Sequence, residues 1–238
     1  MLPDHIVIEP PPFDAFTALG FSAITVTVAV FTPLILAQGD RERALRLFLV
    51  ILGVMAASGT AAATGVLSRF DHFPPPMALM MAAVALGSIG LGLSRFGKQL
   101  AATTPMLALV GLQSFRLPLE LIMHRAGDLG IMPVQLSYAG YNYDILTGLG
   151  ATGLYVAANL GRPPSRALVW AWNIWGIACL CVITVVAITA SPMVRAFGDA
   201  PEQLNTWVLF MPYVWLPTVL VTIAATGHVL ITRRLLAT

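Results

Sequence analysis

Charged residues are scarce in this chain of 238 residues, because Asp, Glu, Lys and Arg together make up only 10% of it. Soluble domains carry about 25%. Hydrophobic residues make up 58%, and the mean hydropathy is +0.82. This composition excludes an ordinary soluble domain and predicts membrane helices, each of which needs ~20 apolar residues to cross the hydrocarbon.

Lysine is almost absent, since the chain holds only Lys98. A retinal protein needs a Schiff-base lysine in its last helix, so retinal is excluded. The net charge is +2, and its basic residues are scattered, which excludes a nucleic-acid partner. Cys179 and Cys181 lie two residues apart, so helical spacing points them to nearly opposite sides and they cannot pair. No metal-type spacing or cofactor motif is present, so neither a metal nor a cofactor is predicted.

The first 14 residues lack the positively charged start of a signal peptide. They contain four acidic or histidine side chains and three consecutive prolines, Pro10 to Pro12. We therefore interpret residues 1–14 as an acidic tail outside the cytoplasm.

Apolar runs between charged or proline-rich breaks predict an all-α bundle of seven transmembrane helices in a single domain spanning residues 15–232. Lipid leaves such segments only the helical option, because every backbone polar group must be satisfied internally. The predicted helices cover residues 15–37, 47–68, 77–94, 105–124, 144–160, 167–191 and 207–232, and residues 233–238 form a basic tail.

The orientation of the bundle follows from the excess of Lys and Arg in cytoplasmic loops. One alternate set of loops holds nine basic residues: Arg41, Arg43, Arg46, Arg95, Lys98, Arg162, Arg166, Arg233 and Arg234. The other set holds Arg69, Arg125 and Arg195. We expect the first set in the cytoplasm and the N-terminus outside, in a bacterial inner membrane.

Small residues crowd the second and third predicted helices. Residues 56–65 contain nothing larger than Thr, and residues 87–92 include three glycines and a serine. Because small residues let helix backbones approach closely, we expect these two helices to pack tightly as an antiparallel pair.

The fourth predicted helix carries a polar stripe formed by Gln113, Arg116, Glu120 and His124. Helical geometry puts these side chains on one face. Each charge there costs about 2.5–3.5 kcal/mol at mid-membrane on insertion scales, so the stripe must face protein or water. The spacing of four predicts that Arg116 and Glu120 pair along the helix.

Pro118 interrupts the hydrogen bonding of this helix and favours a kink beside the charged pair. The following connection is half apolar and could fold back over a cavity. Asp144 opens the fifth helix, where it could reach Arg116 or His124; capping of its own helix is an equally good interpretation.

Further polar or aromatic residues lie on the last two predicted helices. Trp170, Trp172 and Trp175 lie near the inner end of the sixth helix, and Trp170 is best interpreted as an anchor at the membrane interface. Asn173 lies deeper and needs a hydrogen-bond partner. Tyr213 stands in a proline-rich stretch that could complete an outward-facing pocket.

Five short stretches in the second half resemble a group of bacterial multi-span membrane proteins for which we know no activity. They are QSFRLPLE at 113–120, PVQL at 133–136, YDILTG at 143–148, WN at 172–173 and PYVWLP at 212–217. Met211 and Tyr213 replace the aromatic pair found around the first proline in those proteins. The resemblance covers about residues 109–230 and implies that Arg116, Glu120, Asp144 and Asn173 act together.

These residues support one leading hypothesis and two rivals. The leading one is a pocket, open to the outside, that binds or translocates a small solute or protons, with Arg116 holding an anionic group and Glu120 exchanging a proton. The first rival is a non-catalytic subunit of a larger membrane complex, whose stripe docks a partner helix. An intramembrane enzyme is disfavoured, because the sequence shows no nucleophile, metal set or cofactor motif.

Overall fold

The computed structural model describes residues 8–237, and within that range the chain is all-helical. Part of the predicted acidic tail, residues 1–7, and the last residue of the basic tail lie outside the described residues. The rest of the basic tail is helical and continues the last helix of the bundle.

Nearly every apolar run of the sequence is a helix. The α-helices are α1 (Ala15–Ala37), α2 (Arg41–Ala63), α3 (Pro76–Leu93), α4 (Arg95–Thr103), α5 (Met106–Leu112), α6 (Arg116–Asp128), α7 (Asp144–Asn159), α8 (Arg166–Thr189) and α9 (Thr222–Ala237). Short helical turns are η1 (Val66–Ser68), η2 (Gln113–Phe115), η3 (Val134–Leu136), η4 (Pro201–Gln203) and η5 (Trp207–Leu209), and η6 (Leu216–Val221) is a π-helix.

Six helices of the described chain are long and apolar enough to cross a membrane. They are Ala15–Ala37, Arg41–Ala63, Pro76–Leu93, Met106–Asp128, Arg166–Thr189 and Leu216–Ala237. The remaining predicted span, the fifth at 144–160, corresponds to α7, which has only 16 residues. At 1.5 Å per residue it is ~24 Å long, short of the ~30 Å hydrocarbon core. The prediction of seven full-length spans is therefore corrected to six, with a shorter seventh helix.

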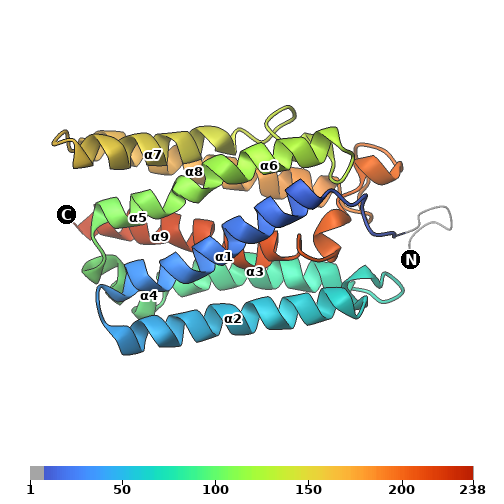
Figure 1. The fold of residues 1–238 in the computed structure, drawn as a ribbon, viewed down its shortest axis with the longest axis horizontal. Helices are drawn as coiled ribbons and strands as arrows, with labels where there is room; N and C mark the ends of the chain where they lie inside the picture. The colour runs from blue at the N-terminus through green and yellow to red at the C-terminus, as the bar shows by residue number, and fades with distance from the viewer. Residues whose placement is uncertain (1–7, 238) are drawn as a thin grey trace.

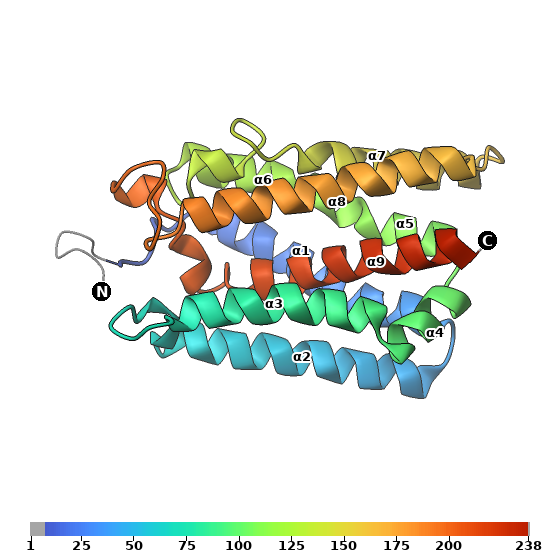
Figure 2. The ribbon, with the colours of Figure 1, turned by 180° about the vertical axis from the view of Figure 1, so that it is seen from behind.

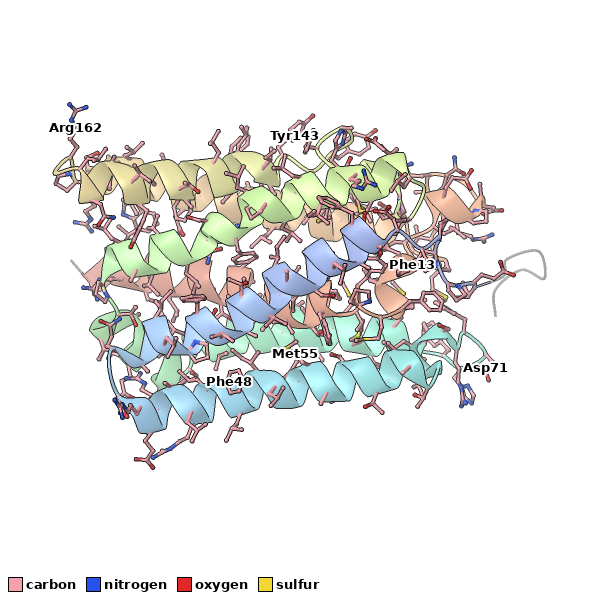
Figure 3. The ribbon with its side chains drawn as sticks, viewed as in Figure 1. Phe13, Phe48, Met55, Asp71, Tyr143 and Arg162 are labelled. Carbon is pink, nitrogen blue, oxygen red and sulfur yellow. The ribbon has the colours of Figure 1, made fainter. Side chains whose placement is uncertain are left out.

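The helices run roughly along one axis, and α1 begins at one end of the bundle while α9 ends at the other (Figure 1). Large apolar side chains point outward along the helices, as at Leu86 and Val50, whereas polar side chains such as Gln113 and Asn173 are fully buried. Figure 3 shows this outward layer of side chains around the ribbon. An apolar exterior around a partly polar interior is what a membrane protein requires.

The expected tight pairing of the second and third helices is wrong. Helix α3 packs along α9, and α2 packs on α1. Helices α2 and α3 run beside each other (Figures 1 and 2), but their backbones do not approach closely in the described chain. A Cβ at Gly92 would overlap Val229 of α9, whereas Gly87 has nothing within 4 Å. Small residues do mark a close contact here, but the partner is the last helix.

The last helix begins later than the apolar run predicts. Residues 207–209 form a 3₁₀ turn, the Met211–Pro212 peptide is cis, and the continuous helix starts at Leu216. Proline fixes φ and removes a backbone donor, so Pro212 and Pro217 prevent a regular helix over the start of this run. The helix then extends to Ala237.

The connection between α6 and α7 folds back into the bundle. Its apolar residues Ile131, Met132 and Leu136 are buried, and so are the polar residues Ser137 and Asn142. Helix α7 consequently begins near Tyr143, part-way along the bundle and not at its end (Figure 3). Irregular backbone at this depth is tolerated where protein surrounds it.

Helix α1 is fixed at its start by Asp14, whose carboxylate accepts from the Thr17 backbone N–H at 2.9 Å and from Arg125 of α6 at 3.0 Å. Side-chain hydrogen bonds from Arg125 and Thr17 hold the pKa of Asp14 well below its usual range. Capping of this kind satisfies donors that the first helical turn leaves open, and the ion pair ties α1 to α6.

Candidate functional site

Helices α6 and α7 cross at a single glycine, and this crossing builds the site. A Cβ on Gly148 would overlap backbone atoms of Arg116 and Leu117, so the two helices touch there through their main chains. Asp144 lies one turn before Gly148 on α7. The close approach therefore brings the carboxylate of Asp144 to the guanidinium of Arg116.

Arg116 and Asp144 form a two-pronged ion pair inside the bundle. The Nε of Arg116 donates to Asp144 Oδ2, and Nη2 lies against Oδ1; the two side chains are 1% and 9% exposed. The expected pairing of Arg116 with Glu120 is wrong, because among the described residues the carboxylate on Arg116 is that of Asp144. The two Asp144 oxygens meet one N–H edge of the guanidinium, which is the bidentate geometry that makes Arg–carboxylate pairs strong.

His228 of α9 contacts Arg116 on its other side. Its Nε2 lies 2.6 Å from Arg116 Nη1, and its Nδ1 lies 2.8 Å from Asn173 Oδ1. Because a guanidinium can only donate, Nε2 accepts and the ring proton is on Nδ1, which donates to Asn173. Asn173 Nδ2 then donates to Thr232 Oγ1 at 2.8 Å. A directed chain of hydrogen bonds thus joins α6, α8 and α9.

Glycine also makes the room for this histidine. A Cβ on Gly176 of α8 would overlap the His228 ring. The Trp172 ring lies 5.4 Å from that ring, and its Nε1 donates to the Thr147 carbonyl at 2.9 Å. Trp172 is therefore buried beside the network.

Glu120 lies one helical turn further along α6 and is 2% exposed. Both of its carboxylate oxygens accept from Nδ2 of Asn142, at 2.9 and 3.0 Å. The same Nδ2 donates to the Leu136 carbonyl, and Asn142 Oδ1 accepts from the Asp144 backbone N–H at 3.2 Å. Asn142 thus links the Glu120 carboxylate to the first backbone N–H of α7. Glu120 has no ion-pair partner within the described chain.

Gln113 is fully buried, and neither its Oε1 nor its Nε2 has a hydrogen-bond partner among the described residues. It begins the η2 turn, and a Cβ on Gly227 of α9 would overlap its amide. A buried amide with no protein partner generally satisfies itself with water or a ligand.

A small pocket opens beside the ion pair. It has a volume of about 50 Å³ and is lined by Arg116, Glu120, Asn142 and Asp144 together with apolar side chains of α6, α8 and the π-helix η6. A site needs about 10–15 Å³ measured in this way to hold one water. The pocket therefore accepts a few waters or a small ion, and its walls supply both signs of charge.

The sequence model of one protein family, described as a domain of unknown function, DUF8737, matches residues 72–236. The chain belongs to the DUF8737 family. No curated protein and no solved structure matches it. The DUF8737 region contains every residue of the polar network, whereas α1 and α2 precede it.

Two of the predicted site residues lie elsewhere in the DUF8737 region. His124 stacks on Tyr138 at 4.1 Å and is 3.5 Å from Asp128 of its own helix. Tyr213 packs edge-on against Phe21 at 5.5 Å in an aromatic cluster. Neither side chain contacts the ion pair, so the structure groups Arg116, Glu120, Asp144 and Asn173 and leaves these two apart. Gln113 lies against Gly227 of α9, and its amide has no hydrogen-bond partner among the described residues.

Two members of the network in this DUF8737 chain were missed from the sequence. His228 did not stand out, because the predicted last helix, 207–232, puts it near the helix end, whereas the helix of the structure runs from Leu216 to Ala237. Its position inside an apolar stretch, directly after Gly227, is the signal that could have identified it. Asn142 was counted as loop, and nothing in the sequence alone places its side chain on Glu120.

Proposed function

We propose that this protein passes protons, or binds a small polar solute, through the pocket lined by Arg116, Glu120 and Asp144. Glu120 takes up and releases the proton. Arg116 binds either Asp144 or an anionic group of a solute that replaces Asp144. The observation that carries this proposal is that two buried carboxylates line one pocket, but among the described residues only Asp144 has a cation within ion-pair distance.

The unpaired state of Glu120 supports its role as the exchanging group. A carboxylate buried without a cation is costly, and such groups are commonly neutralised by a proton. The single amide donor of Asn142 is the only side-chain hydrogen bond that the described residues give it. A proton can therefore arrive and leave at Glu120 without breaking the ion pair that holds α6 against α7.

His228 supplies a second group able to take up a proton. While its Nε2 accepts from Arg116 the ring is neutral, and a proton on Nε2 would turn two cationic donors toward each other. Protonation of His228 thus weakens its contact with Arg116 Nη1, while Nε and Nη2 remain on Asp144. The pocket size supports protons or very small solutes over larger substrates.

The depth of the site also supports translocation. Arg116 is near the middle of the span 106–128, so its partner Asp144 starts α7 near mid-membrane. Transporters commonly bind their substrates where interrupted helices meet near the midplane. The folded-back connection before α7 gives this chain a comparable interruption.

We place the protein in a bacterial inner membrane, crossing it seven times with the short α7 included and the N-terminus outside. Helix α1 begins at one end of the bundle and α9 finishes at the other, which requires an odd number of crossings (Figure 1). The basic residues of α2, α4 and the α7–α8 turn lie at the end where α9 finishes. Reporters fused after residue 238 should therefore be active only in the cytoplasm. A periplasmic signal would overturn this orientation.

Proton flux in liposomes tests the proposed function. Purified protein is reconstituted with a pH-sensitive dye inside the vesicles, and a potassium gradient with valinomycin drives protons inward. Flux should exceed that of empty vesicles and should be lost in Glu120→Gln. The matched control is Glu42→Gln, because Glu42 is exposed and pairs with Arg46 of its own helix.

If proton flux persists in Glu120→Gln, Glu120 is not on the proton path. Wild-type protein without flux, purifying with a stoichiometric membrane partner in mild detergent, would instead support the accessory-subunit role. Helix α2 favours that rival, because only Met55, Gly59 and Ala62 of its residues are buried.

A further inference from the structure

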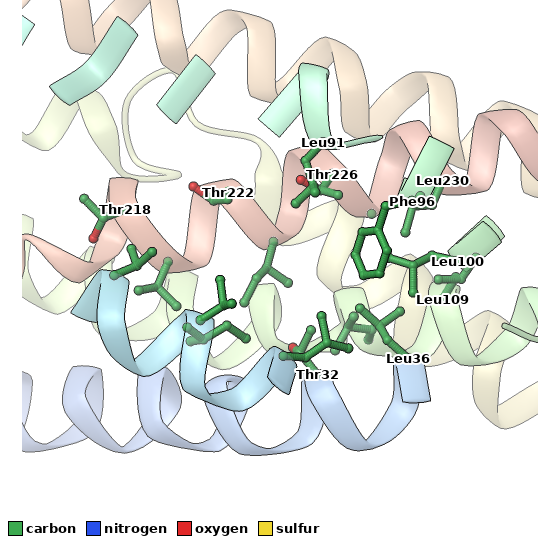
Figure 4. A pocket seen from close by; sticks show the side chains of 18 residues that line it. Thr32, Leu36, Leu91, Phe96, Leu100, Leu109, Thr218, Thr222, Thr226 and Leu230 are labelled. Carbon is green, nitrogen blue, oxygen red and sulfur yellow. The ribbon is translucent and has the colours of Figure 1, made fainter. Parts of the chain in front are cut away.

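A second cavity, separate from the polar pocket, lies between α2 and the α3–α4 pair with α9 behind it (Figure 4). Its volume is about 210 Å³. An engineered apolar cavity of about 150 Å³ is large enough to bind benzene, so this one can hold a substantial hydrocarbon group. Apart from threonine hydroxyls, the side chains that line it are apolar.

Exposure changes from one side of this cavity to the other. Val50 and Val54 on α2 and Leu91 on α3 are 65%, 41% and 42% exposed. On the far side, Leu109 and Leu230 are almost completely buried. The cavity therefore opens sideways between α2 and α3, toward the surface that faces lipid in a membrane.

The face of α2 that lines the cavity ends in a cation. Leu47, Val50, Ile51 and Val54 line the cavity, and Arg43 lies one turn before Leu47 on the same helix face. The Arg43 guanidinium lies 5.9 Å from the ring of Phe96, which also lines the cavity. Its Nη2 is buried and has no hydrogen-bond partner among the described residues.

One polar group inside the cavity also lacks a partner. Thr32 of α1 is 4% exposed, and its Oγ1 has no hydrogen-bond partner within the described chain. The other lining threonines bond to carbonyls: Thr218 to Val214 at 2.8 Å and Thr226 to Ser88 at 3.2 Å. Figure 4 shows Thr32 across the cavity from the threonines of η6 and α9.

We propose that this cavity binds one chain of an anionic phospholipid, whose phosphate pairs with Arg43. The cation at the end of the α2 face fits the headgroup, the sideways opening admits the chain, and the apolar walls replace its contacts with neighbouring lipid. Basic groups between helices near the membrane surface are known to bind anionic headgroups. The oxygen of an ester-linked chain can accept from Thr32.

Native mass spectrometry of the full chain, delipidated in detergent and titrated with phosphatidylglycerol or phosphatidylcholine, tests the proposal. The wild-type chain should bind one phosphatidylglycerol per copy in preference to phosphatidylcholine. Arg43→Gln should weaken phosphatidylglycerol binding about fivefold, the factor that one Arg near an anionic surface contributes, and leave phosphatidylcholine binding unchanged. Arg46→Gln is its control, because Arg46 is exposed and paired with Glu42.

A second pair of variants tests the cavity apart from the charge. Val50→Trp places a large ring at the mouth and should abolish binding of both lipids, whereas Leu49→Trp, 54% exposed and outside the cavity lining, should bind as wild type. Both positions face outward, so both variants should fold with an unchanged melting temperature. Equal affinity for the two lipids would contradict the proposed selectivity for an anionic headgroup. Unchanged lipid binding in Val50→Trp, or dimerisation in place of lipid binding, would contradict the proposal that a lipid chain occupies the cavity.

Discussion

Separating Arg116 from Asp144 should be among the most damaging changes available in this protein. Arg116→Gln leaves the Asp144 carboxylate buried without its cation, and it also removes the donor to His228. Breaking a buried ion pair from one side typically costs about 3–5 kcal/mol. Asp144→Asn should cost a similar amount, because the guanidinium is then the uncompensated charge.

The double variant should be more stable than the sum of the single losses predicts. Neutralising both partners leaves two amides that can hydrogen-bond, so we expect a coupling energy of about 2–3 kcal/mol, at the upper end of the usual range for contacting residues. The measurement is a double-mutant cycle on unfolding in mixed micelles, followed by circular dichroism. Additive losses would show that the pair does not hold the fold.

Two further double-mutant cycles act as controls. Arg125 and Asp14 form the same two-pronged contact at the surface, with 45% and 24% of their side chains exposed, so their coupling should be much smaller. Arg116 with Glu120 should also couple more weakly than Arg116 with Asp144. Equal coupling in all three cycles would refute the assignment of Asp144 as the partner that Arg116 requires.

The remaining predictions concern the packing around the ion pair. Gly148→Ala should destabilise the protein by about 1–3 kcal/mol, because its Cβ meets backbone that cannot move aside. A Cβ at Gly153 of the same helix would have no atom within 4 Å, so Gly153→Ala should be neutral or stabilising. If both variants lower the free energy of unfolding equally, the close contact of α6 and α7 at Gly148 is contradicted. His228→Gln should cost about 1–3 kcal/mol by leaving buried donors unmet, whereas His124→Gln should cost little; the reverse order would contradict the network.

The sequence predicted the centre of the site because of where its charges lie. An arginine and a glutamate inside an apolar run are costly unless they face protein or water, and this argument singled out Arg116 and Glu120 without a structure. It also placed Asp144 within reach of Arg116. The spacing rule then selected the wrong pair, because it describes neighbours on one helix and says nothing of a second helix that a glycine brings into contact.

The errors in the fold have a related cause. Hydropathy describes how apolar a run is, but it does not show where the run stops being a regular helix. Residues 207–215 are apolar enough to continue the last span, yet they form a 3₁₀ turn and a proline-rich bend before Leu216. That shift moved His228 from the expected membrane surface to the middle of the helix, next to Arg116.

The π-helix η6 forms a wall of both cavities. Leu216, Leu220 and Val221 line the polar pocket, while Thr218 and Val219 line the apolar cavity between α2 and α3. A π-helix is uncommon and often occurs at functional sites, because its extra residue leaves regular hydrogen bonding incomplete. An occupant of the apolar cavity would contact Thr218 and Val219, whereas Leu216, Leu220 and Val221 border the pocket beside Glu120. If the cavity binds lipid and the pocket passes protons, η6 is a segment that both would contact, with no direct contact between lipid and proton.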